Sequence, residues 1–238
     1  PYLAFGKTYG KMTGMPVGLI QTSLGGSPME RWNPKDGDLY LNMVDKIHET
    51  GGRYAGVLWY QGCSDTNPGP AEKYLEHFRE YVEATRKELG YEIPFFTMQL
   101  NRQINGINDE CWGMVRDAQA RAAKEIPGVS VLTTSNLSLC DGIHNTAQAN
   151  VALGEKLAKQ CAHVLNGKEE YQPPELVKVE RADEAERKSF QLEGSGIWLK
   201  LTCDHVKNCF LVYSAVGKDS GFTLTDSEGE VEILHIRG

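Results

Sequence analysis

The sequence predicts an α/β fold: a doubly wound parallel sheet followed by a small C-terminal antiparallel β appendage. In the first part, short runs that are apolar throughout alternate with amphipathic helical segments, which is typical of parallel strands covered on both faces. After residue 170 the pattern changes to short alternating runs, which favour antiparallel hairpins. We therefore expect an α/β domain at residues 1–170 and a β-rich accessory region at residues 171–238.

The predicted elements of the first domain follow one another in regular order. Apolar runs of strand type lie at residues 17–23, 54–60, 94–100 and 129–134. Apolar residues at helical spacing predict helices at residues 2–12, 39–50, 71–89, 112–124 and 145–158. Ligands of such sheets bind beyond the carboxyl ends of the strands. We expect the loops that follow the strands to converge there, at residues 23–27, 61–65, 101–103 and 141–144.

The accessory region begins after a linker signal, Tyr171-Gln172-Pro173-Pro174. Its predicted strands lie at residues 188–192, 197–203, 210–214, 221–225 and 231–236. His205 and His235 fall in this region, and as lone hairpin histidines they are interpreted as structural or solvated.

Composition excludes several classes of function. Of the 238 residues 40% are hydrophobic and 24% charged, with no apolar run long enough for a membrane span. The net charge of -7 disfavours nucleic acid as a partner, because phosphate binding needs clustered lysine and arginine. The six cysteines include no Cys-x-x-Cys pair and no metal-ligand spacing, so we expect no metal and no cofactor. Cys203 and Cys209 could pair across a hairpin, although free thiols are the commoner arrangement.

Asp141-Gly142-Ile143-His144 is the strongest chemical signal. A carboxylate three residues before a histidine, in a turn that opens a helix, can hold the imidazole as a general base. The alternative is a helix-capping aspartate beside an incidental loop histidine.

Two further loops carry polar or glycine-rich sequences where a strand ends. The paired glycines Gly25 and Gly26 permit a sharp turn whose backbone amides can point at a ligand, or they form a plain turn. Gln61 opens the polar cluster Gln61-Gly62-Cys63-Ser64-Asp65, and its amide either takes part in chemistry or braces the loop.

With these loops in place, the chain resembles the SGNH-type carbohydrate esterases, within them the sialate O-acetylesterase group. The resemblance extends over nearly the whole chain. Three ordered blocks carry it: Gly18-Leu19-Ile20-Gln21-Thr22-Ser23-Leu24-Gly25-Gly26-Ser27-Pro28-Met29-Glu30-Arg31-Trp32, Val57-Leu58-Trp59-Tyr60-Gln61-Gly62-Cys63-Ser64-Asp65, and Asp141-Gly142-Ile143-His144 with the following Gly154-Glu155-Lys156-Leu157-Ala158.

The resemblance implies a flavodoxin-like SGNH hydrolase that removes acetyl groups from sugar hydroxyls by a Ser-His-Asp mechanism without a metal. His144 would be the base and Asp141 its orienting partner. Gly25, Gly26 and Gln61 would supply oxyanion-hole donors, which fits the need for preorganised neutral donors at developing negative charge. Cys63 and Asn101, in the loops after two strands, are candidate substrate-binding residues. The expected partner is an acetylated carbohydrate, either sialic acid or a polysaccharide.

Two features depart from the family pattern. The family's nucleophile lies in a Gly-Gln-Ser-Asn block after a first strand, and residues 1–238 contain no such block. We therefore expect an upstream segment of the same gene product to bring the serine and to lie between the strands at 17–23 and 57–60; Ser23 and Ser64 are weaker substitutes. Cys63 stands where relatives commonly carry glutamate.

Other functions remain open at this stage. The chain could be a non-catalytic carbohydrate-binding relative, an acetylxylan-type esterase or a flavodoxin-like binding module, although the last leaves the Asp141/His144 spacing unexplained. The resemblance is compatible with a periplasmic or secreted protein. The sequence itself leaves the compartment and the oligomeric state open.

Overall fold

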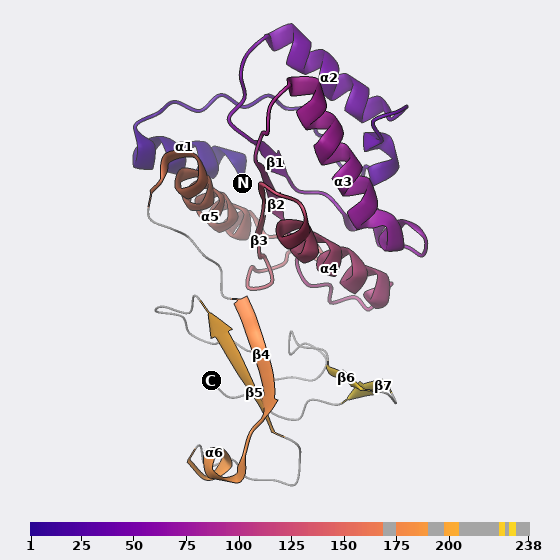
Figure 1. The fold of residues 1–238 in the computed structure, drawn as a ribbon, viewed down its shortest axis with the longest axis vertical. Coiled ribbons are helices and arrows are strands. Elements are labelled where there is room, and N and C mark those ends of the chain that lie inside the picture. The colour runs from indigo at the N-terminus through magenta and orange to yellow at the C-terminus, as the bar shows by residue number, and fades with distance from the viewer. Residues whose placement is uncertain (169–174, 190–197, 205–223, 227–228, 232–238) are drawn as a thin grey trace. The chain divides into compact units, whose positions relative to one another are not determined.

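The structure is a computed structural model that describes residues 1–168, 175–189, 198–204, 224–226 and 229–231 (Figure 1). The described residues divide into two compact units. One contains the α/β fold up to residue 168, and the other contains β4, β5 and α6. The predicted domain boundary at residues 170 and 171 lies outside the described residues and stays a prediction.

Three parallel strands form the sheet of the α/β unit. They are β1 (Val57–Trp59), β2 (Phe95–Met98) and β3 (Val129–Leu132), in the order β1-β2-β3. The strands are short and β2 is buried along its whole length, as the continuous apolar runs predict. The predicted parallel α/β fold is thus confirmed.

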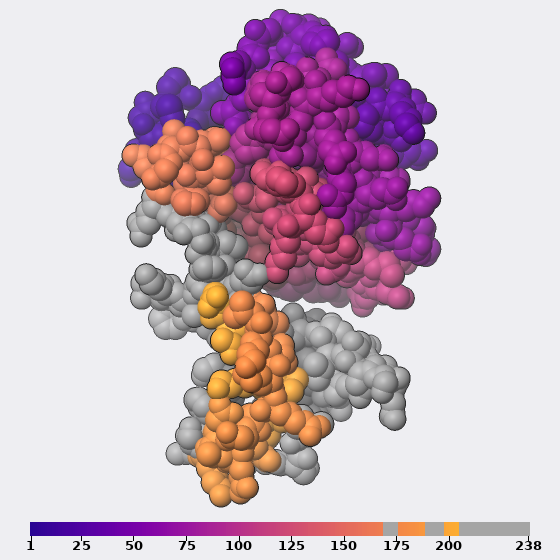
Figure 2. Space-filling model, viewed as in Figure 1, coloured from indigo at the N-terminus to yellow at the C-terminus, as the bar shows by residue number. Residues whose placement is uncertain are grey.

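Five helices cover the two faces of this sheet: α1 (Tyr2–Thr13), α2 (Asp38–Thr50), α3 (Pro70–Leu89), α4 (Asp109–Glu125) and α5 (Ala147–Asn166). Successive residues of β2 enter opposite layers, because side chains alternate along a strand. Phe95 packs in an apolar cluster with α2, α3 and α4, whereas Phe96 packs with α1 and α5. Figure 1 shows these two groups of helices on either side of the sheet, and α3 and α4 form much of the face seen in Figure 2.

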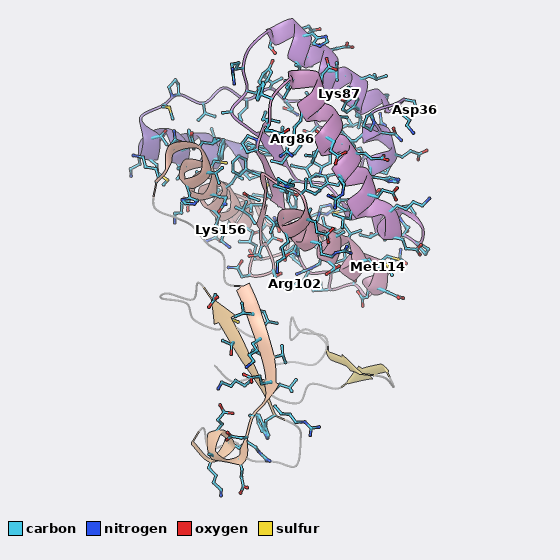
Figure 3. All side chains as sticks on the ribbon, in the orientation of Figure 1. Asp36, Arg86, Lys87, Arg102, Met114 and Lys156 are labelled. Carbon is cyan, nitrogen blue, oxygen red and sulfur yellow. The ribbon has the colours of Figure 1, made fainter. Side chains whose placement is uncertain are left out.

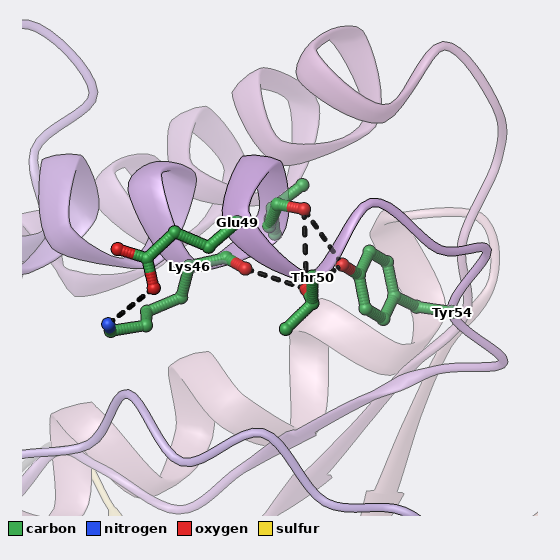
Figure 4. Close-up of polar contacts among 5 residues, drawn as sticks. Lys46, Glu49, Thr50 and Tyr54 are labelled. Carbon is green, nitrogen blue, oxygen red and sulfur yellow. Dashed lines mark hydrogen bonds and ion pairs between the residues drawn. The ribbon is translucent and has the colours of Figure 1, made fainter.

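The helices end where the sequence provides C-terminal signals. Gly14, Gly51, Gly90 and Gly167 take left-handed backbone conformations just after α1, α2, α3 and α5. At the end of α2 the Thr50 hydroxyl donates to the Lys46 carbonyl at 2.7 Å, and the Tyr54 hydroxyl donates to the Ile47 carbonyl at 2.9 Å (Figure 4). Carbonyl groups in the last turns of α2 thus have side-chain hydrogen-bond partners before the chain enters β1.

The predicted strand at residues 17–23 is wrong for this structure. Residues 15–24 have no regular secondary structure, and Leu19, Ile20 and Leu24 have exposed fractions of 51%, 43% and 48%. Within the described part of the chain β1 pairs only with β2, so the run has no neighbouring ladder that could hold it as a strand. The expected segment between this run and β1 stays a prediction.

The predicted antiparallel pairing of the C-terminal region is confirmed in part. β5 (Leu199–Asp204) corresponds to the predicted run at 197–203 and pairs antiparallel with β4 (Glu175–Arg181), which the sequence reading missed. β6 (Leu224–Asp226) pairs antiparallel with β7 (Gly229–Val231).

The predicted strand at 188–192 is wrong at its start, because 188 and 189 end the helix α6 (Glu184–Ser189), where lysine pairs with glutamate one turn earlier. Residues 190–192, the run at 210–214, and most of the runs at 221–225 and 231–236 lie outside the described residues. No helix among the described residues is both long and apolar enough to cross a membrane.

Candidate active site

The turn that carries Asp141 and His144 is built by a small loop before α5. The backbone N–H of Cys140 donates to the carbonyl of His144 at 2.9 Å, and that of Thr146 donates to Ser138 at 3.0 Å. The Thr146 hydroxyl then caps α5 by accepting from the N–H of Ala149 at 3.0 Å. The position of the histidine is therefore set by the start of a long packed helix.

Asp141 holds the turn with one oxygen and the imidazole with the other. Its Oδ1 accepts the backbone N–H groups of Ile143 (2.8 Å) and His144 (2.7 Å), while its Oδ2 lies 2.8 Å from His144 Nδ1. The predicted contact between carboxylate and ring is therefore present. The alternative of an aspartate that only caps the helix does not describe this geometry, because Thr146 supplies the cap.

These hydrogen bonds also favour the ionised form of the Asp141 carboxylate. The backbone N–H groups of Ile143 and His144, followed by the His144 ring, lower the pKa of Asp141 to about 2. An ionised carboxylate can only accept, so Nδ1 of His144 carries the donated proton. In the neutral ring the lone pair is then on Nε2, and the ring is 64% exposed, as a general base requires.

The Gly25-Gly26 turn presents unused donors. Gly26 has φ of +72°, a left-handed conformation that glycine adopts at little cost. Among the described residues, neither glycine N–H has an acceptor within hydrogen-bond distance, and both glycines are exposed. The turn can therefore donate to an anionic group.

Gln61 braces the site in this structure. Its Nε2 donates both hydrogens within the protein, to the Ser27 carbonyl at 2.9 Å and to Asp65 Oδ2 at 2.5 Å. Its Oε1 is buried and has no partner among the described residues. The expected oxyanion-hole role for Gln61 would require one of these two bonds to open, so the geometry corresponds to the loop-bracing alternative.

Asn101 occupies the centre of a buried network. It is 1% exposed, and its Nδ2 donates to Asn145 Oδ1 at 2.7 Å and to the Leu137 carbonyl at 3.1 Å. Asn145 Nδ2 donates to the Tyr60 hydroxyl at 3.1 Å, and burial raises the pKa of that phenol to about 12. This network links the ends of β1 and β2 to the residue after His144. A direct contact between Asn101 and substrate would require the network to open.

The neighbouring loop supports the same turn. Arg102, labelled in Figure 3, donates from Nη1 to the carbonyls of Ser135 and Leu137 at 2.5 and 3.2 Å. The N–H of Ile104 donates to the Gly142 carbonyl at 3.0 Å, and a Cβ on Gly142 would lie 3.0 Å from Asn105 Cβ. Gly142 therefore permits close packing of this loop against the turn.

Cys63 is half-buried beside the same loops. Burial, with smaller contributions from the negative charges of Asp65 and Asp141, raises the pKa of its thiol to about 11. The thiol therefore stays protonated near neutral pH and is a poor nucleophile.

Sequence reasoning missed several residues that hold these loops. Asn145 and Tyr60 stand next to chemistry-bearing residues, but nothing in their own pattern indicates a long-range contact. Ser27 and Asp65 were visible only as members of polar loops. The expectation that Gln61 and Gly26 line one depression with the pair stays a prediction.

Two surface hollows lie away from this turn. One of about 530 Å³ is lined by residues around the C-terminal end of α3, including Arg86 and Lys87, labelled in Figure 3. The second, of about 60 Å³, is lined in part by Met29, His77 and Glu80. Neither includes Asp141 or His144. The candidate site is therefore identified from its chemistry and hydrogen bonding and not from cavity size.

Comparison with known proteins places this arrangement in context. Residues 1–163 match the family described as "Carbohydrate esterase, sialic acid-specific acetylesterase". The chain is 30% identical over 149 residues to the probable carbohydrate esterase At4g34215 of Arabidopsis thaliana, a match that covers 60% of this chain and 54% of that protein. The chain thus spans about half the length of this curated relative.

Two solved structures resemble the chain. The crystal structure of the Arabidopsis thaliana protein AT4G34215 has a TM-score of 0.61 at 27% identity and covers 68% of each chain. The structure of XAC1771, a novel carbohydrate acetylesterase from Xanthomonas citri, has a TM-score of 0.65 at 25% identity, covering 75% of this chain and 44% of that one. The family match extends over more than half of the chain and includes every residue of the candidate site. This chain belongs to the carbohydrate esterase family of sialic acid-specific acetylesterases.

Proposed function

We propose that this protein is a carbohydrate O-acetylesterase that acts on O-acetylated sialic acid, with His144 as general base and Asp141 as its orienting partner. The observation that carries the proposal is the 2.8 Å contact between Asp141 Oδ2 and His144 Nδ1, in a turn fixed by backbone hydrogen bonds. Family membership supports the substrate class.

The proposed chemistry is acyl transfer through a serine. Nε2 of His144 takes the proton of the attacking hydroxyl as its oxygen bonds to the acetyl carbonyl carbon. The oxyanion of the tetrahedral intermediate accepts from the N–H groups of Gly25 and Gly26. The intermediate collapses, the bond to the sugar oxygen breaks, and that oxygen receives the proton from His144. Water then bonds to the carbonyl carbon of the acetyl-serine as His144 takes its proton. The bond to the serine oxygen breaks, acetate leaves, and the serine oxygen receives the proton from His144.

Other expected residues have secondary parts in this proposal. Gln61 contributes mainly by bracing the Gly25-Gly26 turn, and it becomes a donor to the oxyanion only when one of its present bonds opens. Cys63 offers a neutral thiol where it can contact the sugar. Asn101 acts through Asn145, which follows the base directly.

The substrate proposal is tested by acetate release. Protein produced from its complete gene is incubated with O-acetylated sialic acid and, in parallel, with acetylated xylan. We expect the larger kcat/KM for the sialic acid ester. Higher kcat/KM for acetylated xylan would move the proposal to an acetylxylan-type esterase, and sugar binding without acetate release would favour a non-catalytic relative.

The nucleophile is tested by covalent labelling. A fluorophosphonate reacts with an activated serine, and mass spectrometry of the labelled peptide identifies it. We expect one labelled serine, with labelling abolished in His144→Ala because the base is lost. Absence of label from protein that does release acetate would contradict the serine mechanism.

A further inference from the structure

An oxyanion site at the Gly25-Gly26 turn requires that the two backbone N–H groups be held in fixed positions. Donors contribute to catalysis only when they are held in place before charge develops. Two consecutive glycines in an exposed turn have wide backbone freedom, and the preceding residues 15–24 have no regular structure. Something beyond the turn's own sequence must fix these N–H groups.

Ser27 closes the turn from its C-terminal side. It is 5% exposed, and its hydroxyl donates to the Leu24 carbonyl at 2.8 Å, across the two glycines. The same oxygen accepts the indole N–H of Trp32 at 3.0 Å. Trp32 is itself 3% exposed and packs edge-on against Trp59 of β1, with ring centroids 5.1 Å apart. The hydroxyl therefore connects the turn to the core of the sheet.

Asp65 anchors the following residues from another loop. Asp65 is 3% exposed, and its carboxylate accepts the Met29 N–H at 3.0 and 3.2 Å and the Gln61 amide at 2.5 Å. Gln61 passes this restraint on, because its second amide hydrogen is donated to the Ser27 carbonyl. A buried carboxylate is costly to desolvate, and burial raises its pKa. Apolar residues would fill the same space at a lower desolvation cost, so the buried polar residues at this place indicate a role other than stability.

We propose that Ser27 and Asp65 are positioning residues that fix the N–H groups of Gly25 and Gly26 in the geometry of an oxyanion site. The inference rests on the proposed esterase function for its chemical purpose. The buried hydrogen-bonded cluster of Ser27, Trp32, Gln61 and Asp65, the polar clamp, holds the Gly25 and Gly26 N–H groups in place before charge develops. Ser27 and Asp65 do not contact the substrate in this proposal.

The test compares Ser27→Ala, Ser27→Thr and Asp65→Asn with the natural protein. Ser27→Ala removes the bond across the glycines, whereas Ser27→Thr keeps a hydroxyl. Asp65→Asn keeps the shape but replaces one acceptor with an amide donor that faces other donors. Thr85→Val is the matched control, since Thr85 is 1% exposed and its hydroxyl bonds the Tyr81 carbonyl within α3.

The first readout is ¹⁵N NMR of the Gly25 and Gly26 amides, which does not depend on activity. We expect both amides to be ordered in the natural protein, Ser27→Thr and Thr85→Val. In Ser27→Ala and Asp65→Asn we expect lower heteronuclear NOE values and shifted resonances. Unchanged amide signals in these two variants would overturn the inference, whatever the enzyme activity.

The second readout is steady-state kinetics. For Ser27→Ala and Asp65→Asn we expect kcat to fall by about 100-fold, at the low end of the loss of one oxyanion donor, with little change in KM. Ser27→Thr should recover most of kcat. Equal losses in Thr85→Val would contradict the positioning role by showing a general stability effect. A natural protein that releases no acetate refutes the proposed function. The amide signals still show whether Ser27 and Asp65 fix the Gly25 and Gly26 N–H groups.

Discussion

The carboxylate of a single residue, Asp141, positions the candidate base His144. Asp141 orders the turn through backbone N–H groups and orients the ring through its second oxygen. An exposed ion pair alone contributes little to stability, so the backbone bonds matter more for the geometry than the pairing of charges. The contact between the two side chains is therefore local, whereas the loop after β2 and the start of α5 hold the turn in place.

The pH dependence of stability tests this arrangement. Because folding lowers the Asp141 pKa from 3.8 to about 2, its contribution to stability is complete above the unfolded value. It is lost as pH falls through the folded value. The difference in unfolding free energy between the natural protein and Asp141→Asn should therefore shrink between these two pH values in urea titrations. A difference that stays constant down to the lower pH would show that folding does not lower the pKa of Asp141.

The reactivity of Cys63 tests the electrostatics of the neighbouring loop. A pKa of about 11, against 9.0 for an ordinary thiol, lowers the thiolate fraction near neutral pH by about 100-fold. We expect iodoacetamide to modify Cys63 far more slowly than the exposed Cys140 at the same pH, as measured by peptide mass spectrometry. Comparable rates at the two sites would mean that Cys63 is ionised and available for chemistry.

At the element scale, the position of the base depends on how α5 packs on α1. Gly154 lies at the crossing, where an added Cβ would lie 2.9 Å from Ala4 Cβ and from the Phe5 backbone nitrogen. Such close approach is possible only without a side chain. The packing of this helix pair fixes the N-terminus of α5, immediately after His144.

Substitution of this glycine separates packing from helix propensity. Gly154→Ala should lower the free energy of unfolding by about 1–3 kcal/mol, because the methyl group overlaps α1. Gly113→Ala is the control: Gly113 lies within α4 with open space around it, and the change should stabilise by about 0.5–1 kcal/mol. Urea unfolding measures both. A stabilised Gly154→Ala would show that the helices do not pack as described.

For the fold as a whole, the sequence predicts the three parallel strands of the α/β unit and their helices better than it predicts the other strands. Strand β2 is buried along its whole length and β1 and β3 are each buried in part, and their apolar runs indicate them as strands. The run at 17–23 is apolar at residues 17, 19 and 20, but a strand also needs a paired neighbour, which the run itself does not reveal. β4 was missed because it directly follows the Pro173-Pro174 linker signal and four of its seven residues are charged.

The contacts of the candidate site also fall into those that the sequence predicts and those that it does not. Asp141 and His144 are three residues apart, so their contact is local and could be predicted from spacing. The clamp at Ser27 joins residues 34 to 36 positions apart, and the Tyr60–Asn145 bond joins residues 85 apart. These partners become visible only when the sheet brings the loops together. The donor assigned to Gln61 from resemblance is, in the structure, already engaged in that clamp.

His144 is the proposed base of an acetylesterase, and the kinetics of His144→Ala in protein from the complete gene test this role. His48→Ala is the matched control, since His48 is another exposed histidine paired with a carboxylate, at 2.7 Å from Glu88. We expect kcat/KM for acetate release to fall by about 10²- to 10⁴-fold in His144→Ala, with cooperative unfolding retained and no comparable loss in His48→Ala. Near-natural turnover by a well-folded His144→Ala protein would contradict the claim.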